Sequence, residues 1–226
     1  MSVPVFVIRP EPGLSSTMER GRALGLEMVA MPLSEAAPVE WQVPATTFDG
    51  ILLGSANGLR QAGAMRAQLA ELPVYAVGEA TAVAARDMGF DIAVTGDGSL
   101  QALIDTLSPD RTLRLLRLAG EERLPLAAPP HVSIETATTY RIVHRALSAS
   151  EVAQLDKGGV VLLHSAASAS HFASEVRRAG IDHGRLALAT LSPRIARSVS
   201  DGWKNVAVAA IPDDPALLST ALDMCH

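Results

Sequence analysis

The sequence has little of what several protein classes require. It contains a single cysteine, Cys225, which excludes an intrachain disulfide and a cysteine-based metal cluster. Aromatic residues make up only 4% of the chain, and no apolar run approaches the ~18 residues of a membrane span. The N-terminus also lacks the basic segment and apolar stretch of a secretory signal. We therefore expect a cytoplasmic protein that does not contact a membrane.

Positive charge is scarce as well. The net charge is -5, and lysine and arginine form no run anywhere in the sequence. Nucleic acids and acidic membrane surfaces bind basic patches, so neither is an expected partner. An anionic small molecule would have to be held by local groups rather than by a broad positive field.

Motifs of nucleotide-binding and hydrolytic enzymes are missing. No GxGxxG follows a predicted strand, and no GxxxxGK[ST], HExxH or GxSxG occurs. The histidines lack metal-ligand spacing, and we interpret His164 and His171 as polar packing residues. A phosphoacceptor domain would need acidic residues gathered at strand ends, which Asp49 alone does not supply.

Short apolar runs that alternate with amphipathic segments define the fold class. With 226 residues, 48% of them hydrophobic, the chain can form one large or two compact domains. The runs are unbroken by polar residues, as in strands of parallel sheets buried on both faces. They span residues 5–8, 50–55, 74–78, 160–165, 186–192 and 206–212. Apolar residues at helical spacing follow most of them, so the sequence predicts an α/β fold.

Capping residues predict where helices begin and end. Ser148 with Glu151 fits a capping box, and Asp214 is expected to be an N-cap before Pro215 at the first helical position. Helices are expected to stop at Gly25, Gly89 and Gly180.

Two parts of the chain repeat one order of elements. Residues 50–107 and 160–222 run in parallel with a nearly constant offset, which predicts a βαβαβα module present twice. A further βαβ stretch, residues 3–31, is too small to bury itself and must join one module, and the residues allow either. Between the modules, residues 132–147 alternate β-branched and polar residues, which predicts an extended exposed ribbon.

Short motifs then occur in the order found in one enzyme family. They are VIRP, FDGILLGSANG, VYAVGEATA followed by GF, LRLAGEER, TTYR, LLHSAAS and LSPRIA. By these motifs the chain resembles the uroporphyrinogen-III synthases over essentially its whole length. The resemblance implies an α/β fold of two flavodoxin-like parallel-sheet lobes joined by a two-stranded extended linker. The implied lobes are residues 1–35 with 147–226 and residues 38–140, with linker strands near 32–38 and 133–146.

The resemblance also implies a reaction. These enzymes close hydroxymethylbilane, a flexible linear tetrapyrrole with many carboxylates, to uroporphyrinogen III, with inversion of ring D and loss of water. They are hydro-lyases of tetrapyrrole and haem biosynthesis and use neither metal nor organic cofactor. The implied partners are this substrate and, transiently, hydroxymethylbilane synthase. Because the sequence shows no large exposed apolar pattern, a monomer is expected.

Strand-to-helix turns are the expected binding positions. In open parallel sheets, ligands lie beyond the carboxyl ends of strands, where first-turn N–H groups and helix dipoles attract anions. The candidate substrate-binding residues at such turns are Ser55, Asn57, Gly78, Thr81, Ser165, Ser168, Ser192 and Arg194. Capping and turn chemistry explain the same residue types equally well. The resemblance favours Thr81 and Ser165 most, and it implies that these turns face a common cleft.

Tyr140 and Arg9 complete the candidates. The family's tyrosine that matches Tyr140 faces the cleft, so the resemblance implies a catalytic role. A phenol stays protonated at neutral pH and could help the substrate hydroxyl leave as water; the alternative is packing on the ribbon. Arg9 and Arg194 could each bind a propionate through a guanidinium fork, and their alternative is a solvated surface side chain.

A second class of function remains open. The same fold could serve as a non-catalytic two-lobe module for ligand binding or regulation, because fold does not imply function. Regulators of this kind usually carry a DNA-binding domain, for which 226 residues leave no room. The cyclising enzyme is therefore the favoured interpretation.

Overall fold

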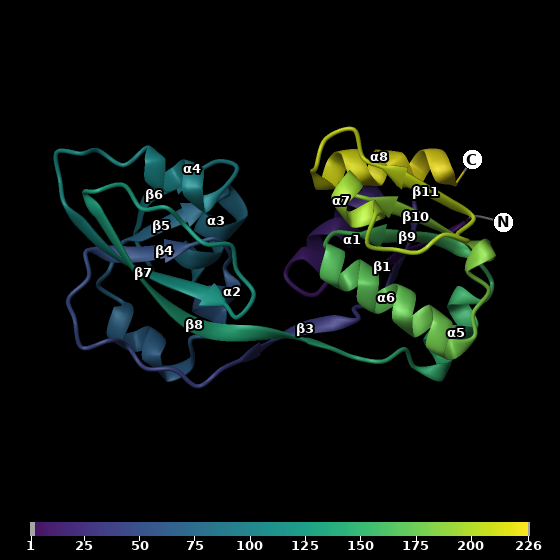
Figure 1. Cartoon of the computed structure of the whole chain (residues 1–226), viewed down its shortest axis with the longest axis horizontal. Coiled ribbons are helices and arrows are strands. Elements are labelled where there is room, and N and C mark those ends of the chain that lie inside the picture. Colours follow the sequence, from purple (N-terminus) through teal and green to yellow (C-terminus); the bar gives the residue numbers. More distant parts are fainter. Residues whose placement is uncertain (1–2, 226) are drawn as a thin grey trace. The chain divides into compact units, whose positions relative to one another are not determined.

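The computed structural model describes residues 3–225, which divide into two compact units (Figure 1). Unit 1 comprises Met1–Glu35 and Val143–His226, and unit 2 comprises Ala36–Ile142. The chain passes between the units inside β3 (Ser34–Pro38) and again inside β8 (Val132–His144). Within residues 3–225, no helix is long and apolar enough to cross a membrane.

Unit 1 is built on a five-stranded sheet in the order β11-β10-β9-β1-β2, and every neighbouring pair is parallel. Its strands are β1 (Pro4–Val7), β2 (Glu27–Ala30), β9 (Gly159–Leu163), β10 (Leu186–Thr190) and β11 (Asn205–Val208). The central strand β9 is buried along its whole length, which explains its unbroken apolar sequence. Because β1 pairs with β9, the N-terminal βαβ stretch belongs to the sheet of the C-terminal strands.

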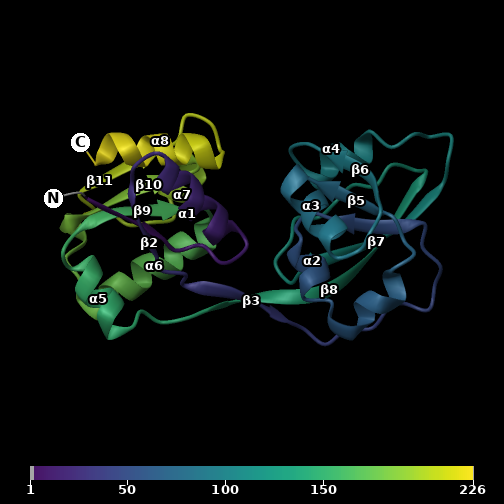
Figure 2. The ribbon, with the colours of Figure 1, turned by 180° about the vertical axis from the view of Figure 1, so that it is seen from behind.

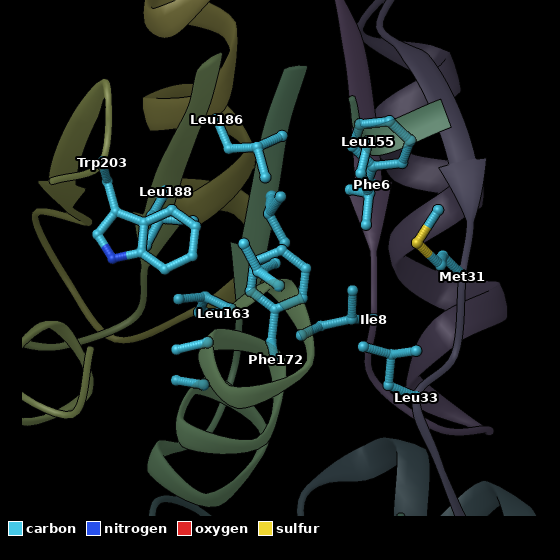
Figure 3. Close-up of a cluster of buried hydrophobic side chains, with 14 of the residues drawn as sticks. Phe6, Ile8, Met31, Leu33, Leu155, Leu163, Phe172, Leu186, Leu188 and Trp203 are labelled. Atoms are coloured by element: carbon cyan, nitrogen blue, oxygen red, sulfur yellow. The ribbon is translucent and has the colours of Figure 1, made fainter. Parts of the chain in front are cut away.

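Helices cover both faces of this sheet. They are α1 (Gly13–Ala23), α5 (Ala149–Leu155), α6 (Ala166–Ala179), α7 (Pro193–Ala196) and α8 (Asp214–Met224), with a 3₁₀ turn at His183–Arg185. Side chains along a strand alternate between its faces. Phe6 and Ile8 therefore join Phe172 of α6 in one cluster (Figure 3). Val5 packs on the other face with Leu217 of α8 and with residues of α1, and Figure 2 shows these two helices.

Unit 2 contains a six-stranded sheet in the order β3-β8-β7-β4-β5-β6. Its remaining strands are β4 (Gly50–Leu53), β5 (Val74–Val77), β6 (Ile92–Gly96) and β7 (Leu113–Gly120), and its helices are α2 (Asn57–Arg60), a 3₁₀ helix (Gly63–Leu69), α3 (Glu79–Asp87) and α4 (Leu100–Asp105). The pairs from β8 to β6 are parallel. The prediction of an α/β protein with parallel sheets is confirmed.

The two sheets share one spatial order. In unit 1 the strands β9, β10 and β11 follow β2 and β1 across the sheet, and in unit 2 the strands β4, β5 and β6 follow β8 and β7 in the same way. The segments that repeat in the sequence therefore occupy equivalent places. The additional pair precedes them along the chain in unit 1 and follows them in unit 2.

Two segments differ from expectation. The helical pattern through Leu59 and Leu69 is split at Gly63, whose φ of +59° leaves α2 a single turn before the 3₁₀ helix. Most of the expected ribbon is a sheet strand, because β8 pairs with β7 from Val132 to Tyr140.

The helix ends follow the sequence signals with one correction. The capping box of Ser148 and Glu151 is present, and Gly180 ends α6 in the left-handed conformation. At α8, however, the N-cap is Asp213, whose carboxylate accepts the Ala216 N–H at 2.8 Å. The prediction of Asp214 as N-cap was wrong because its carboxylate accepts hydrogen bonds from other side chains of unit 1 and does not cap the helix.

Hydrogen-bonded carboxylates make the stability of unit 1 depend on pH. The hydrogen bond from Arg178 and the Leu147 N–H lower the pKa of Glu175 to about 2, although burial opposes the shift. A hydrogen bond from Arg145 likewise lowers the pKa of Glu151 to about 2. Both pKa values lie below the ordinary 4.5. Their contribution is therefore complete above pH 4.5 and is lost as the pH falls from there towards 2.

We expect Glu175→Gln to lower the free energy of unfolding at pH 7 by about 1–3 kcal/mol, because charge-assisted hydrogen bonds to Arg178 are lost. The same variant should lose less stability than the parent between pH 5 and pH 2. Urea unfolding at several pH values, followed by Trp203 fluorescence in a Trp41→Phe background, measures both effects. Glu19→Gln, at an exposed position of α1, is the control. An unchanged pH dependence in Glu175→Gln would contradict the lowered pKa of Glu175.

Candidate functional site

The carboxyl ends of the unit 2 strands open on a pocket of about 370 Å³. Its lining residues are Gly54, Ser55, Val77, Gly98 to Gln101, Arg117 to Gly120, Glu122 to Leu126 and Tyr140. The volume lies within the ~300–1,000 Å³ of small-molecule sites. Of the residues that the sequence singled out, the pocket brings together Ser55 and Tyr140.

Tyr140 lies on β8 against the end of β7. The register shifts between Ala119 and Gly120, so that Gly120 pairs with Tyr140. A Cβ at Gly120 would lie 2.9 Å from the phenol ring, so glycine makes room for the ring here. Burial raises the pKa of Tyr140 above 10.0, although a hydrogen bond with Ser55 and the charge of Arg117 lower it in part. The phenol is therefore protonated at neutral pH and can donate a hydrogen bond or a proton.

Ser55 stands at the turn from β4 into α2. Its Oγ accepts the backbone N–H of Asn57 at 3.3 Å. Asn57 itself is buried and is not a lining residue of the pocket. Because α2 is a single turn, few peptide dipoles are aligned there, and the anion attraction expected from this helix is small.

Gly78 and Thr81 stand at the start of α3. Gly78 is the N-cap with φ of +77°, next to the pocket residue Val77. The N–H groups of Thr81 and Ala82 donate to the Gly78 carbonyl at 3.0 and 3.2 Å. The N–H groups of Glu79 and of the following residue are thus the first-turn donors that helical bonding does not use. Thr81 is not a lining residue, and the Glu79 carboxylate would repel an anion at this turn.

In unit 1, the hydroxyls of Ser165 and Ser168 contact each other and the first turn of α6. Ser165 is the N-cap of α6, and its Oγ accepts the Ser168 N–H at 3.1 Å and donates to Ser168 Oγ at 2.9 Å. Ser192 precedes α7, a single turn whose first residue, Pro193, has no N–H to offer. Arg194 is exposed on that turn.

Arg9 belongs to a polar cluster at the carboxyl ends of β1 and β9. Its Nη1 donates to Asp214 Oδ1 and to Thr17 Oγ1, both at 3.2 Å. Asp214 also accepts from His164 Nε2 at 2.9 Å and from Thr17 Oγ1 at 2.8 Å. Burial lowers the pKa of Arg9 and of His164. Burial alone would raise the pKa of Asp214, but the hydrogen bonds from His164 and Thr17 hold it below its usual value. A propionate bound by Arg9 would compete with Asp214.

Two arginines at the pocket are not among the residues predicted from the sequence. Arg117 lies on β7 with 7% of its surface exposed, and its Nη1 donates to the Leu124 carbonyl at 3.0 Å. Arg123 Nη1 donates to the Gly120 carbonyl at 2.9 Å and to Thr138 Oγ1 at 3.0 Å. The available signal was a charge inside the apolar run LRLLRLAG, because arginine is rarely buried without a partner.

Within residues 3–225, no group of three or more histidine, cysteine, aspartate or glutamate side chains could hold a metal ion.

The fold and the site define an α/β protein with parallel sheets and an arginine-containing pocket at the carboxyl ends of its strands, the place where such folds bind small molecules. The family model of uroporphyrinogen-III synthase HemD matches residues 15–219. The chain belongs to the uroporphyrinogen-III synthase family.

One solved structure agrees with this assignment at the level of the fold. The crystal structure of uroporphyrinogen-III synthetase from Helicobacter pylori is 16% identical, covers 99% of this chain and 100% of that chain, and has a TM-score of 0.66. A mutant uroporphyrinogen III synthase from the extremely thermophilic bacterium Thermus thermophilus is also 16% identical, with 99% and 100% coverage and a TM-score of 0.48. No curated protein matches the chain.

The contact between Ser55 and Tyr140 can be tested without substrate. Ser55→Ala should raise the pKa of Tyr140 further, because the hydrogen bond that favours the ionised phenol is lost. Tyrosinate absorbance against pH, in a Tyr75→Phe background that leaves Tyr140 as the only tyrosine, measures this pKa. Ser165→Ala in unit 1 is the control. An identical titration in Ser55→Ala and the parent would refute the contact.

Proposed function

We propose that this protein converts hydroxymethylbilane to uroporphyrinogen III, closing the linear tetrapyrrole with inversion of ring D and loss of water. Membership of the family over residues 15–219 carries the proposal. The pocket supports it, because a neutral phenol stands beside guanidinium groups that can bind the carboxylates of such a substrate. With a net charge of -5, the protein has to bind this polyanion through local donors.

Tyr140 is the proposed general acid. Its phenol donates a proton to the leaving hydroxyl of the bilane, which departs as water and leaves an electrophilic methylene carbon on its ring. The Ser55 hydrogen bond and the charge of Arg117 stabilise the phenolate that forms. The methylene carbon bonds to the ring D carbon that already carries the bridge to ring C, and the bridge bond then breaks and re-forms at the free α-carbon of ring D, which inverts the ring. The proton lost from that α-carbon restores the phenol. Proton transfer of this kind contributes about 10²- to 10⁴-fold in rate.

We further propose that the two units are flavodoxin-like lobes and that β3 and β8 form the linker. When the five strands of the unit 1 sheet are numbered in chain order, their spatial order is 2-1-3-4-5, which is the flavodoxin order. Unit 2 has the same spatial order, with the first strand pair moved to its C-terminal end. On this proposal the lobes are residues 1–35 with 143–226 and residues 36–142, with both linker strands at the boundaries.

The proposed contribution of the strand-to-helix turns differs between positions. The starts of α3 and α6, at Gly78 with Thr81 and at Ser165 with Ser168, precede helices of 9 and 14 residues and keep N–H groups for a carboxylate. Two single-turn helices contribute less: α2, at Ser55 and Asn57, and α7, at Ser192 and Arg194. A carboxylate at a helix start gains about 0.3–1 kcal/mol from the dipole, so several sites must act together.

The proposal is tested by supplying the purified protein with freshly generated hydroxymethylbilane and separating the product isomers. We expect the type III isomer, formed faster than the spontaneous closure to type I in buffer. If only the type I isomer forms, at the rate of buffer alone, the proposed activity is refuted. Binding of the bilane without any type III product would favour the non-catalytic module of the same fold.

Tyr140→Phe should lower kcat most among the hydroxyl losses, by about 10²-fold, because the general acid is removed. Ser55→Ala, Thr81→Ala and Ser165→Ala should each reduce activity more gradually, because binding is divided among several turns. Steady-state rates of type III formation, with circular dichroism to verify folding, measure this ranking. Abolished activity in folded Ser55→Ala together with full activity in Tyr140→Phe would reverse it.

A further inference from the structure

The pocket of unit 2 contains a buried positive charge without an internal counter-ion. Within residues 3–225, neither Arg117 nor Arg123 forms an ion pair with a carboxylate. Arg117 Nε is buried and has no hydrogen-bond partner in this part of the chain, while Nη1 reaches only the Leu124 carbonyl. A buried charged donor without a partner is costly, and a bound anion would satisfy it.

The two guanidinium groups also repel each other. After burial, the nearby charge of Arg123 is the main cause that lowers the pKa of Arg117. The only acidic side chain lining the pocket is Glu122, and it is exposed and outside ion-pair distance of either arginine in the described structure. A carboxylate between the two arginines would remove the repulsion and accept from the unused donors.

The rim of the pocket is apolar. Leu124 has 77% of its surface exposed, an unusual exposure for leucine, and Pro125 and Leu126 follow it along the same wall. An aromatic ring carrying a carboxylate arm matches this arrangement, with the ring against the rim and the arm directed inward. Tyr140 lines the same pocket, so such a ring would lie beside the phenol.

We propose that this pocket is a subsite for one pyrrole ring of the substrate, in which Arg117 and Arg123 bind its carboxylate arm and the loop from Leu124 to Leu126 covers the ring. This inference rests on the proposed function and deepens it. Arg117 is a positioning residue: it binds an arm that does not react and thereby presents the chain of rings to Tyr140. The guanidinium fork matters here as well as the charge, because a carboxylate accepts two parallel N–H bonds from arginine but not from lysine.

Arg117→Lys separates positioning from electrostatic support. It keeps a positive charge near Tyr140 but loses the fork, so KM for hydroxymethylbilane should rise about 10-fold or more while kcat stays within about threefold. Arg117→Gln should raise KM further and also lower kcat. Arg114→Gln is the matched control, because Arg114 is an exposed residue of the same strand outside the pocket. An unchanged KM in both Arg117 variants overturns the subsite.

A binding measurement without turnover completes the test. Uroporphyrin III, the oxidised product, serves as an inert polycarboxylate probe whose fluorescence reports binding. We expect its Kd to rise about 10-fold or more in Arg117→Lys and in Arg123→Gln and to be unchanged in Arg114→Gln. Arg123 lies on a loop, so this variant keeps the test valid if buried Arg117 is needed for folding. Type III product from the parent with an unchanged Kd in Arg123→Gln and Arg117→Lys refutes the subsite alone; absence of type III product refutes the proposed function.

Discussion

The structure depends on strands that are buried on both faces. Such strands carry few polar side chains along their length, so most polar groups of both units gather where the strands end. Val5 to Ile8 and Ile51 to Leu53 are fully apolar, whereas Arg9 and Ser55 follow them within two residues. The helices that cover each sheet then begin at the same edge and add their unused N–H groups. Fold and site are thus consequences of one constraint on burial.

The two units treat buried charge in opposite ways. In unit 1, Asp214 accepts from Arg9, Thr17 and His164, so its carboxylate is paired within the unit, although His164 Nδ1 is buried without a partner among residues 3–225. In unit 2, Arg117 and Arg123 share a pocket with no carboxylate in ion-pair contact among residues 3–225. A paired carboxylate stabilises the fold, whereas guanidinium groups without a carboxylate partner remain available to bind an anion. On the proposed function, unit 2 therefore offers the more available cationic groups for an anionic ligand.

The sequence predicted the elements better than their contacts. Unbroken apolar runs located the strands β4, β5, β9 and β10, because nothing but a doubly buried strand explains them. The N-cap of α8 was misplaced by one residue, since Asp213 and Asp214 are both competent caps and distant side chains that bind Asp214 decide between them. Ser55 and Tyr140 were each singled out, but their proximity to Arg117 depends on the register shift at Gly120, for which no local pattern exists.

The repeated module shows how one arrangement acquires different uses. Ser165 and Ser55 follow equivalent strands, β9 and β4. Ser165 precedes a helix of 14 residues and uses its Oγ to cap it. Ser55 precedes a single turn that ends before Gly63, so its bond to the Asn57 N–H has little helix to stabilise, and its hydroxyl also interacts with Tyr140. The strand pair that follows in unit 2, β7 and β8, supplies Arg117 and Tyr140 at this position. In unit 1 the equivalent pair is β1 and β2, whose edge carries Arg9 bound to Asp214. The strand pair comes first along the chain in unit 1 and last in unit 2, but the spatial order of the strands is the same. The carboxyl-end edges of the two sheets therefore differ in the chemistry of their residues and not in topology.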